Sequence, residues 1–486
     1  MTTETVARTD KHTFCKLHYK KVCALIDLPA LTELFAARSS PSILGGNMAK
    51  KEADGFSYWA AEPKEVFEFH AGQKNPFGKL QKTLAKYKLE KDYTGNLPKG
   101  IFRGGWIGYF SYDLGRYIEP TAFEGSGAII DDLRTPLIRL CFYDKVIACD
   151  HLEKVFLLIA LELPNDTERP EEKLDGLEQL LNKSSRVRLP EPTPVDIENV
   201  DFAQIRSTMD KNYYLRAVKK IKRHIYDGDV YQINFSQRFD CDFNANPIDL
   251  FHWQNRYNPS GYAAYIDDGK FQVVSASPEM FVTIRDGFIQ TKPIKGTRPR
   301  LSDTGEGKEI NTKNFDELLA SEKEQAELNM IIDLERNDVA RICRPGTRKV
   351  IQPRTIEIYP TVFHAVATVG GQLCDGLTIG DILGAMFPGG SITGAPKIKA
   401  MEIINQTEPT ARGVYTGSIG FIGIDGSVCL NIAIRTIIIA GQKSFVQTGG
   451  GIVADSDPEA EWDETLTKAR ALLAGINSVQ RGACSG

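Results

Sequence analysis

The sequence predicts an α+β fold in which mostly antiparallel strands form layers and helices pack against them. Three observations favour this class. Stretches of alternating apolar and polar residues occur in runs, as in Phe102 to Tyr112 and Lys154 to Leu161. Helical patterns stand between some of these stretches but not between all of them. An Asp425-Gly426 pair separates two further alternating stretches, which is typical of a hairpin turn.

The chain divides near residue 200, where its composition becomes polar. Between Leu163 and Val200 there is one short helical stretch, Glu171 to Asn182, and then prolines follow at positions 190, 192 and 194. We therefore expect an N-terminal region over residues 1–200 and a second domain over residues 201–486. A chain of 486 residues is long enough for two domains of ordinary size.

A helix is predicted at the start of the second domain. Asp210 is placed to cap its first turn, and Gly228 is placed to end it. Its apolar residues fall on one face, at Tyr214, Val218, Ile221 and Ile225. The alternating segment Val230 to Phe239 then predicts a strand.

Two longer elements are predicted further along the chain. A single long helix is expected over Phe315 to Asn337. Two strands are expected around the Asp425-Gly426 turn, one over Phe421 to Ile424 and one over Val428 to Ile439.

Composition excludes several classes of protein. The chain is 42% hydrophobic with a mean hydropathy of −0.26, and no apolar run is long enough to cross a membrane. The first residues, Met1 to His12, are polar, so no signal peptide is expected. Nine cysteines without a Cys-Xaa-Xaa-Cys pair argue against disulfides and zinc, and favour the cytoplasm. A net charge of −4 with only short basic clusters argues against nucleic-acid binding.

The densest motif is the glycine-rich stretch Met386 to Lys397. Its glycines, hydroxyls and lysine suit a backbone that approaches an anion closely. It is not a phosphate-binding P-loop, because Ala395 stands where that loop needs lysine and no Ser or Thr follows Lys397. On these residues alone, an anion site and a plain turn before a helix are equally consistent with the motif.

A second glycine cluster, Gly449 to Gly451, precedes a predicted helix. On that helix Glu461 and Glu464 are three residues apart and share a face. Upstream, Glu324 and Glu327 repeat this spacing. Two such pairs have the chemistry to hold one Mg²⁺, although acidic helix faces are more often simply solvated.

Four further residues are candidates for binding or catalysis. Arg435 and Lys468 suit a substrate carboxylate. Lys295 lies between an apolar residue and a glycine, where partial burial would lower the pKa of its amine and make it nucleophilic. His364 interrupts an apolar stretch. Each also has an ordinary explanation, as a surface residue or, for His364, as a satisfied core residue.

Taken together, these segments resemble the chorismate-utilising enzymes, a family that includes anthranilate synthase, aminodeoxychorismate synthase, isochorismate synthase and salicylate synthase. The matching blocks occur in family order: Asp227 to Arg238, Ser277 to Glu279, Pro293 to Thr297, Ile332 to Asp338, His364, Gly389 to Lys397, Arg412 to Gly417 and Gly449 to Val453. The resemblance covers residues 205–475 and, more weakly, the N-terminal half. It implies a large two-layered, mostly antiparallel β-sandwich flanked by helices, like that of anthranilate synthase component I, with chorismate bound by residues 201–486.

The resemblance also implies a set of site residues. The family's Mg²⁺, which bridges the enzyme to the ring carboxylate of chorismate, would be held by Glu327, Glu461 and Glu464. Catalytic positions are matched by Lys295, Glu279 and His364, with Glu279 as a general acid whose pKa we expect to be raised. Substrate-binding positions are matched by Thr297, Ser391, Tyr415, Arg435, Gly451 and Lys468.

Two positions separate the members of the family. Isochorismate and salicylate synthases resemble one another in a lysine that activates water, and this chain has Gln232 there. Anthranilate synthases have alanine where this chain has Lys295, and aminodeoxychorismate synthases have lysine; Asn234 and Phe235 also suit the latter type better. The resemblance therefore implies formation of 4-amino-4-deoxychorismate from chorismate and ammonia. Anthranilate synthase component I is the alternative, and a silent chorismate-binding subunit is a further one.

A partner is implied by what this sequence lacks. No cysteine lies in a Gly-Xaa-Cys-Xaa-Gly nucleophile elbow, so ammonia is expected from a separate glutaminase subunit, component II. The tryptophan-binding segment of some relatives, Leu-Leu-Xaa-Ser, aligns with Ile43 to Gly46, which lacks the serine. Bound tryptophan is therefore not expected.

Overall fold

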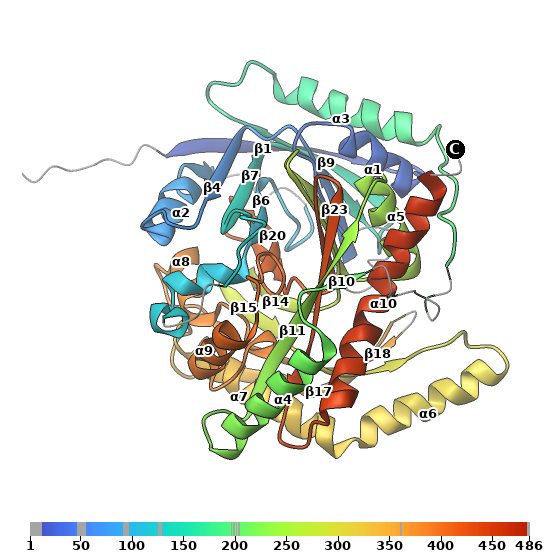
Figure 1. Ribbon diagram of the computed structural model, residues 1–486. Coiled ribbons are helices and arrows are strands. Elements are labelled where there is room, and N and C mark those ends of the chain that lie inside the picture. Colours follow the sequence, from blue (N-terminus) through green and yellow to red (C-terminus); the bar gives the residue numbers. More distant parts are fainter. Residues whose placement is uncertain are drawn as a thin grey trace, which may run out of the picture.

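Two large β-sheets, packed face to face with helices around them, make up the computed structural model (Figure 1). The structure describes residues 12–45, 55–90, 97–124, 129–195, 197, 200, 202, 205–359 and 362–483, with the side chains of 482 and 483 excepted. The α+β class and the mostly antiparallel sandwich predicted from the sequence are confirmed. Each sheet contains strands from both sides of residue 200, and the division into 1–200 and 201–486 stays a prediction.

The larger sheet has 13 strands in the described part of the chain. Their order across the sheet is β10 (Arg206–Ser207), β11 (Gln232–Asp242), β23 (Lys443–Ile452), β22 (Thr436–Ala440), β13 (Phe271–Ser277), β12 (Tyr262–Asp267), β2 (Ser42–Leu44), β3 (Phe56–Ala60), β8 (Lys145–Asp150), β9 (Val155–Glu162), β1 (Thr13–Val22) and β5 (Tyr87–Leu89). The short β19 (Gly394–Ala395) also pairs with β11. Within these described strands, only β1 and β5 pair in parallel.

The smaller sheet has 10 strands in the described residues, and all of its pairs are antiparallel. Their order is β16 (Ile294–Pro299), β18 (Val362–Gln372), β15 (Phe288–Lys292), β14 (Met280–Arg285), β21 (Val428–Asn431), β20 (Ser418–Gly423), β6 (Gly105–Phe110), β7 (Ile138–Tyr143) and β4 (Glu65–Phe69). The remaining strand, β17 (Lys349–Ile358), pairs with β18.

Apolar side chains from both sheets form the main core between them. Tyr58 on β3 meets Phe421 on β20 edge to face, with ring centroids 5.6 Å apart. Phe102 packs against both rings, at 5.9 Å and 4.8 Å. Aromatic pairs of this kind add about 0.5–1.5 kcal/mol each beyond the apolar area that they bury. These contacts tie strands from the two halves of the sequence into one core.

Helices cover the outer faces of the sandwich. They are α1 (Leu28–Ala36), α2 (Pro76–Leu84), α3 (Pro170–Ser184), α4 (Lys211–Tyr226), α5 (Pro247–Tyr257), α6 (Glu306–Ala320), α7 (Glu322–Ala340), α8 (Ile379–Met386), α9 (Lys397–Thr407) and α10 (Pro458–Ala483), with short 3₁₀ turns η2 (Tyr112–Tyr117), η3 (Pro120–Phe123) and η4 (Gly390–Ile392). A second apolar cluster places α1, α3, α5 and α10 on the larger sheet. A third places α4 and α9 against β11, and Figure 1 shows α4 and α10 running beside that strand.

The helix predicted after Asp210 is confirmed as α4. The Asp210 carboxylate accepts a hydrogen bond of 2.6 Å from the backbone N–H of Tyr213, which satisfies a free donor of the first turn. Tyr214, Val218 and Ile221 are buried against β11. The strands predicted over Phe102 to Tyr112, Lys154 to Leu161 and Val230 to Phe239 correspond to β6, β9 and β11, and the stretch Glu171 to Asn182 lies within α3.

The single helix predicted over Phe315 to Asn337 is wrong, because two helices, α6 and α7, meet there. Ser321 separates them. Its backbone is extended, with φ −67° and ψ 106°, and its side chain accepts a hydrogen bond from the N–H of Glu324. A serine in this conformation is a strong N-cap, so a new helix starts at the residue after it.

The strand predicted over Val428 to Ile439 is also wrong. It consists of β21 and β22, which belong to different sheets. Arg435, between them, has a positive φ of 49°. This turn takes the chain from the smaller sheet to the larger one and leaves the arginine beside the site described below.

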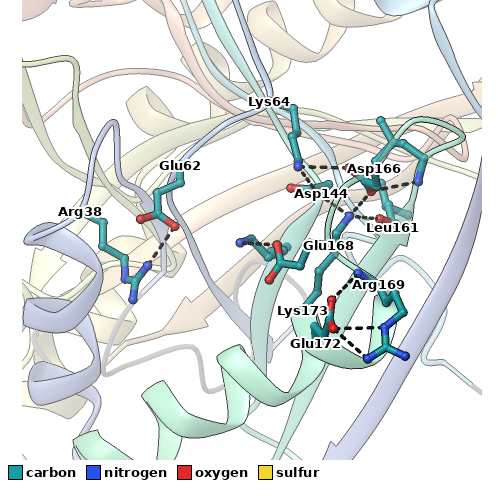
Figure 2. A network of polar contacts seen from close by, with 12 residues as sticks. Arg38, Glu62, Lys64, Asp144, Leu161, Asp166, Glu168, Arg169, Glu172 and Lys173 are labelled. Atoms are coloured by element: carbon teal, nitrogen blue, oxygen red, sulfur yellow. Dashed lines mark hydrogen bonds and ion pairs between the residues drawn. The ribbon is translucent and has the colours of Figure 1, made fainter.

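A network of buried charges holds α3 against the larger sheet (Figure 2). Lys173 is fully buried and donates hydrogen bonds to Asp144 at 2.7 Å, to the carbonyl of Leu161 at 2.6 Å and to Asp166. Lys64 lies 3.5 Å from Asp144 and 3.1 Å from Asp166. The three ammonium donors of Lys173 thus each have an acceptor, which is the condition for burying a charge without a large penalty.

Three further expectations bear on class and ligand. Within the described residues, none of the helices combines the length and the apolar character that crossing a membrane requires. The cysteines that the structure describes are free thiols. Gly46, which replaces the serine of the tryptophan-binding segment, lies outside the described residues, so that expectation stays a prediction.

Candidate functional site

The predicted site residues come from distant parts of the chain and gather beside β11, β16, β18 and β23. Glu279 lies between β13 and β14, Lys295 and Thr297 on β16, Glu327 on α7, His364 on β18, Ser391 in η4, Tyr415 before β20, Arg435 before β22, Gly451 on β23, and Glu461, Glu464 and Lys468 on α10. Hydrogen bonds and mutual charge effects, described next, connect them.

Lys295 and Glu279 meet at Ser391. The Lys295 amine donates a hydrogen bond of 3.3 Å to the carbonyl of Ser391, and the Ser391 hydroxyl donates to the carboxyl of Glu279. The backbone N–H of Ile294 makes a longer contact, 3.4 Å, with the same carboxyl. A potential nucleophile and a potential proton donor are therefore held at one residue.

The environment shifts both of these groups towards their uncharged forms. Burial lowers the pKa of the Lys295 amine, and the negative charges of Glu279 and Glu327 only partly oppose this effect. Burial raises the pKa of Glu279, which is 4% exposed, in the direction predicted for a general acid. Burial thus favours the uncharged amine and the protonated carboxyl, which are the forms that a nucleophile and a proton donor need.

His364 is a neutral imidazole in this site. Burial and the positive charge of Arg435 lower its pKa to about 3. Its Nδ1 lies 2.8 Å from the hydroxyl of Thr297, an exposed residue. This hydrogen bond can select one tautomer of the His364 ring. Its Nε2 is buried and has no hydrogen-bond partner among the described residues. His364 is therefore suited to a hydrogen bond with a substrate and not to proton donation as a cation.

Strands β11 and β23 form one wall of the site. Asn234 stands opposite Gly451 in their pairing, and the Asn234 side chain bonds to the hydroxyl of Tyr415. A Cβ on Gly451 would lie only 2.5 Å from Nε2 of Gln232. Both polar atoms of the Gln232 amide are buried without a partner in the described chain. Glycine at position 451 therefore leaves room beside an amide that is free to bind.

Two basic residues suit substrate carboxylates. Lys468 donates hydrogen bonds of 2.9 Å to the carbonyl of Gly449 and of 2.7 Å to Glu464. Burial lowers the pKa of Arg435, and no described residue accepts a hydrogen bond from its guanidinium. Arg435 is partly buried, and a guanidinium in this state has its full set of donors available for a carboxylate.

The carboxylates predicted to bind Mg²⁺ fit that ion in part. A Cβ on Gly450 would lie 2.9 Å from Oε2 of Glu461 and 3.7 Å from Oε1 of Glu464, so both carboxylates lie above this glycine. Oε2 of Glu461 is buried without a partner, and burial raises the pKa of this group. Glu327 lies close enough to affect the charge of Lys295, whereas Glu324 binds Arg298 at 2.7 Å.

No group of three or more potential metal ligands is assembled within the described residues. Mg²⁺ commonly takes one or two protein carboxylates and completes its shell with water and substrate oxygens. The Glu461 and Glu464 pair, with its orphaned buried oxygen, satisfies that requirement.

The glycine-rich stretch Met386 to Lys397 forms the turn that contains the site residue Ser391. Lys397 donates to Asp338 at 2.5 Å and to the carbonyl of Met386 at 2.9 Å, so its amine is taken up within the protein. Of the two explanations left open for this motif, the structure favours a turn that positions Ser391. It is not a phosphate cradle built around Lys397.

Sequence reasoning gave no role to the buried pair Arg412 and Glu408. Arg412 donates to Glu408 at 2.7 Å, to the carbonyl of Asn234 at 2.6 Å and to the carbonyl of Ile392 at 2.9 Å. Glu408 also accepts the N–H of Ser236 at 2.8 Å. This pair joins β11 to the turn that contains Ser391. The i,i+4 spacing of the two residues was the only signal in the sequence.

Comparisons with known proteins agree with this geometry. The model of the chorismate binding enzyme family matches residues 47–474. Aminodeoxychorismate synthase component 1 of Bacillus subtilis is 40% identical over 384 residues, which are 79% of the chain and 79% of that protein. Anthranilate synthase component 1 of Pseudomonas putida is 39% identical over 407 residues, 83% of the chain and 80% of that protein. The crystal structure of anthranilate synthase component I from Streptococcus pneumoniae has a TM-score of 0.71 at 29% identity and covers 88% of the chain and 94% of its own.

Proposed function

The chain belongs to the family of chorismate-binding enzymes, and we propose that it converts chorismate and ammonia to 4-amino-4-deoxychorismate. The observation that supports this reaction most directly is Lys295, a partly buried lysine with a lowered pKa, bonded to the same residue as the acid Glu279. The Lys295 amine can act as a nucleophile of the protein itself. A reaction in which ammonia attacks chorismate directly would have no use for such a nucleophile.

The proposed reaction uses the two groups in sequence. The uncharged amine of Lys295 adds to C2 of chorismate while the C4 hydroxyl departs as water with the proton of Glu279. Ammonia then adds at C4 and the lysine amine leaves C2. The surplus proton on the new C4 amine returns to Glu279, so the enzyme is restored and the nitrogen remains at C4.

The other residues would bind and orient the substrate. Arg435 and Lys468 would bind its carboxylates, and neutral His364 would make a hydrogen bond through Nε2. Thr297, Ser391, Tyr415 and Gly451 would line the ring. Mg²⁺, when held by Glu461 and Glu464 with Glu327 nearby, would neutralise a substrate carboxylate and withdraw electron density from the ring.

The second candidate is anthranilate synthesis by the same fold. The similarity to the Pseudomonas putida anthranilate synthase is nearly equal to that of the Bacillus subtilis protein, so overall identity does not separate the two reactions. In anthranilate formation the amino group goes to C2 and the product is aromatic. Lys295 at the C2-attack position disfavours this outcome, because its amine would compete with ammonia there. A silent chorismate-binding subunit is disfavoured by the full set of reactive residue types.

We also propose the setting of this reaction. Ammonia would come from glutamine through a separate glutaminase subunit, component II, and the product would lead to p-aminobenzoate and folate in the cytoplasm. The support is the component 1 relatives and the absence of a glutaminase elbow from the sequence.

The deciding experiment incubates the pure chain with chorismate, ammonium and Mg²⁺ and identifies the products by mass spectrometry. Lys295→Ala and Lys292→Ala are run in parallel. The control amine, Lys292, is already bonded to Glu357. We expect aminodeoxychorismate from the wild type and the control and none from Lys295→Ala. Anthranilate from the wild type would transfer the assignment to the second candidate.

A further inference from the structure

Arg412 is a buried arginine to which the proposed reaction assigns no role. It lies between α9 and β20, and its side chain is 1% exposed. Its guanidinium donates two hydrogen bonds to the carboxylate of Glu408, at 2.8 Å and 2.7 Å. It also donates to the carbonyl of Asn234 on β11 at 2.6 Å and to the carbonyl of Ile392 in η4 at 2.9 Å. One side chain therefore joins three segments that are far apart in the sequence.

The turn that Arg412 holds carries the hydrogen-bond acceptor of Lys295. This acceptor is the carbonyl of Ser391, 3.3 Å from the Lys295 amine. The next carbonyl along the chain, that of Ile392, receives the bond from Arg412 and a second one of 3.1 Å from the side-chain amide of Asn234. The two carbonyls belong to consecutive rigid peptide planes, which are joined only at the Cα of Ile392. Fixing the second carbonyl therefore restricts the first.

The carboxylate that anchors Arg412 is itself fixed to β11. Glu408 accepts hydrogen bonds from the backbone N–H of Ser236 at 2.8 Å and from its hydroxyl at 2.7 Å. The guanidinium carbon of Arg412 also lies 4.6 Å from the ring centre of Tyr112 in η2 and 5.9 Å from that of Tyr415. Cations are attracted to aromatic rings at such distances. Arg412 thus contacts both the N-terminal half of the chain and a proposed substrate-binding residue.

These contacts depend on the shape of the guanidinium as well as on its charge. The group presents its N–H donors as a planar fork, and Arg412 directs them to a carboxylate and to two carbonyls on different segments. The donors of a lysine amine all leave from one atom on a flexible stem. We therefore expect a lysine at position 412 to pair with Glu408 without reaching the carbonyls of Asn234 and Ile392 together.

We propose that Arg412 is a positioning residue for chorismate turnover, which fixes the Ile392 carbonyl against β11 and thereby holds the Ser391 carbonyl at the amine of Lys295. Arg412 acts in this way through the turn and not by contact with the reacting atoms. The proposal rests on the proposed function, because it takes Lys295 as the nucleophile.

The test compares Arg412→Lys with Arg238→Lys. Arg238 is a matched control on β11, since it is 4% exposed and binds Asp132 at 2.8 Å and 2.7 Å and Asp240 at 3.0 Å. None of these three residues belongs to the proposed site. Both substitutions therefore weaken a buried arginine–carboxylate cluster, but only the first removes a donor from the turn that contains Ser391.

Chorismate consumption is followed with ammonium and Mg²⁺, and kcat is corrected for the folded fraction. We expect Arg412→Lys to lower kcat roughly 10- to 100-fold with KM changed by less than about 3-fold, because the acceptor of Lys295 is displaced and the substrate contacts remain. Arg238→Lys should keep kcat within about 2-fold of the wild-type value. This separation of kcat from KM, confined to one of two similar clusters, is not expected from a general loss of structure.

A second variant covers the case in which Arg412→Lys does not fold. Arg412→Gln combined with Glu408→Gln removes both charges of the pair, so no buried charge is left without its partner. This chain should fold, and it should show the same loss of kcat because the carbonyls of Asn234 and Ile392 lose the same donors.

An unchanged kcat in a folded Arg412 variant would overturn the proposal. An equal fall of kcat in Arg238→Lys would also overturn it, and so would a rise in KM at unchanged kcat, which would make Arg412 a substrate ligand. The product of the wild type is identified in the same assay. Anthranilate would count against the proposed function, whereas the comparison of the two arginine variants tests the positioning role separately.

Discussion

Lys173 and Lys295 show two ways in which this protein places a lysine amine away from bulk water. The amine of Lys173 has three hydrogen-bond acceptors, two of them carboxylates. The amine of Lys295 has one acceptor among the described residues, a carbonyl at 3.3 Å. Three acceptors hold the first amine in one place, whereas the second amine is only weakly held, and burial lowers its pKa.

The comparison shows that the number of hydrogen-bond partners distinguishes a buried lysine with a structural role from one available for chemistry. A buried charge that is fully paired contributes to holding elements together, and removing one member leaves the others unpaired. A buried amine with few partners is disfavoured as a cation, and its free electron pair is available for attack. The same contrast applies to the partnerless amide of Gln232 and the oxygen Oε2 of Glu461. Among the described residues, Gln232, His364 and Glu461 at the site each have a buried polar atom without a partner, whereas Lys173, Asp144 and Asp166 have none.

Exchanging each lysine for methionine should give the largest contrast in activity. We expect Lys295→Met to reduce formation of aminodeoxychorismate by roughly 10³-fold or more, because the nucleophile is gone. Lys173→Met should leave turnover per folded molecule unchanged, since its network of Asp144, Leu161 and Asp166 contains none of the proposed site residues. The measurement is kcat corrected for the folded fraction. Comparable loss in both variants would remove the functional distinction between the two amines.

The same pair should differ in the opposite sense in stability. Lys173→Met leaves Asp144 and Asp166 buried beside an apolar side chain, and we expect a loss of about 3–5 kcal/mol in the free energy of unfolding. The matched control is Lys145→Met, which removes a more exposed ion pair with Glu168 in the same region and should cost at most about 1 kcal/mol. Urea unfolding at neutral pH measures both. Equal losses in the two variants would mean that the buried network adds no more to the free energy of unfolding than the more exposed ion pair does.

The stability of Lys295→Met should depend on pH in a defined direction. The pKa of Lys295 is lower in the folded protein than its ordinary value of 10.5, so protonation opposes folding at every pH below the folded-state pKa. That penalty disappears as the pH rises from the folded-state pKa to the unfolded one. We therefore expect Lys295→Met to unfold at an equal or higher temperature than the wild type at neutral pH. The advantage should shrink in alkaline buffer, as thermal scans across pH would show.

The smallest effect is expected at the wall of the site. Gly451→Ala would bring a methyl group to 2.5 Å from Nε2 of Gln232, the flexible end of a side chain. We expect the amide to move, KM for chorismate to rise roughly 3- to 10-fold and the unfolding temperature to stay within a few degrees. Steady-state kinetics checks this. An unchanged KM would show that the free amide of Gln232 does not face the substrate.

Local signals were sufficient for elements whose residues point to one structure. Asp210, four apolar residues on one face and Gly228 predict α4 with both of its ends. They were not sufficient where a single residue redirects the chain. The helical pattern continues across Ser321, and only the extended backbone at that serine separates α6 from α7. The alternation from Val428 to Ile439 likewise continues through Arg435, where the chain changes sheet.

For the site, the residue types were identifiable and their relationships were not. The motifs identify Lys295, Glu279 and His364 as candidates. No pattern in the neighbouring sequence indicates that Lys295 and Glu279 both form hydrogen bonds with Ser391. The neutral state of His364 depends on burial and on Arg435, which lies 71 positions away in the chain.

By itself, the sequence determined the class of fold, the family and the residue types available for chemistry, because these depend on periodicity, turn residues and ordered motifs. Only the tertiary structure decided which polar groups are paired and which are left without partners. That outcome depends on burial and on contacts between segments far apart in the chain, and burial without a partner is what lowers the pKa of Lys295 while full pairing holds Lys173 in place.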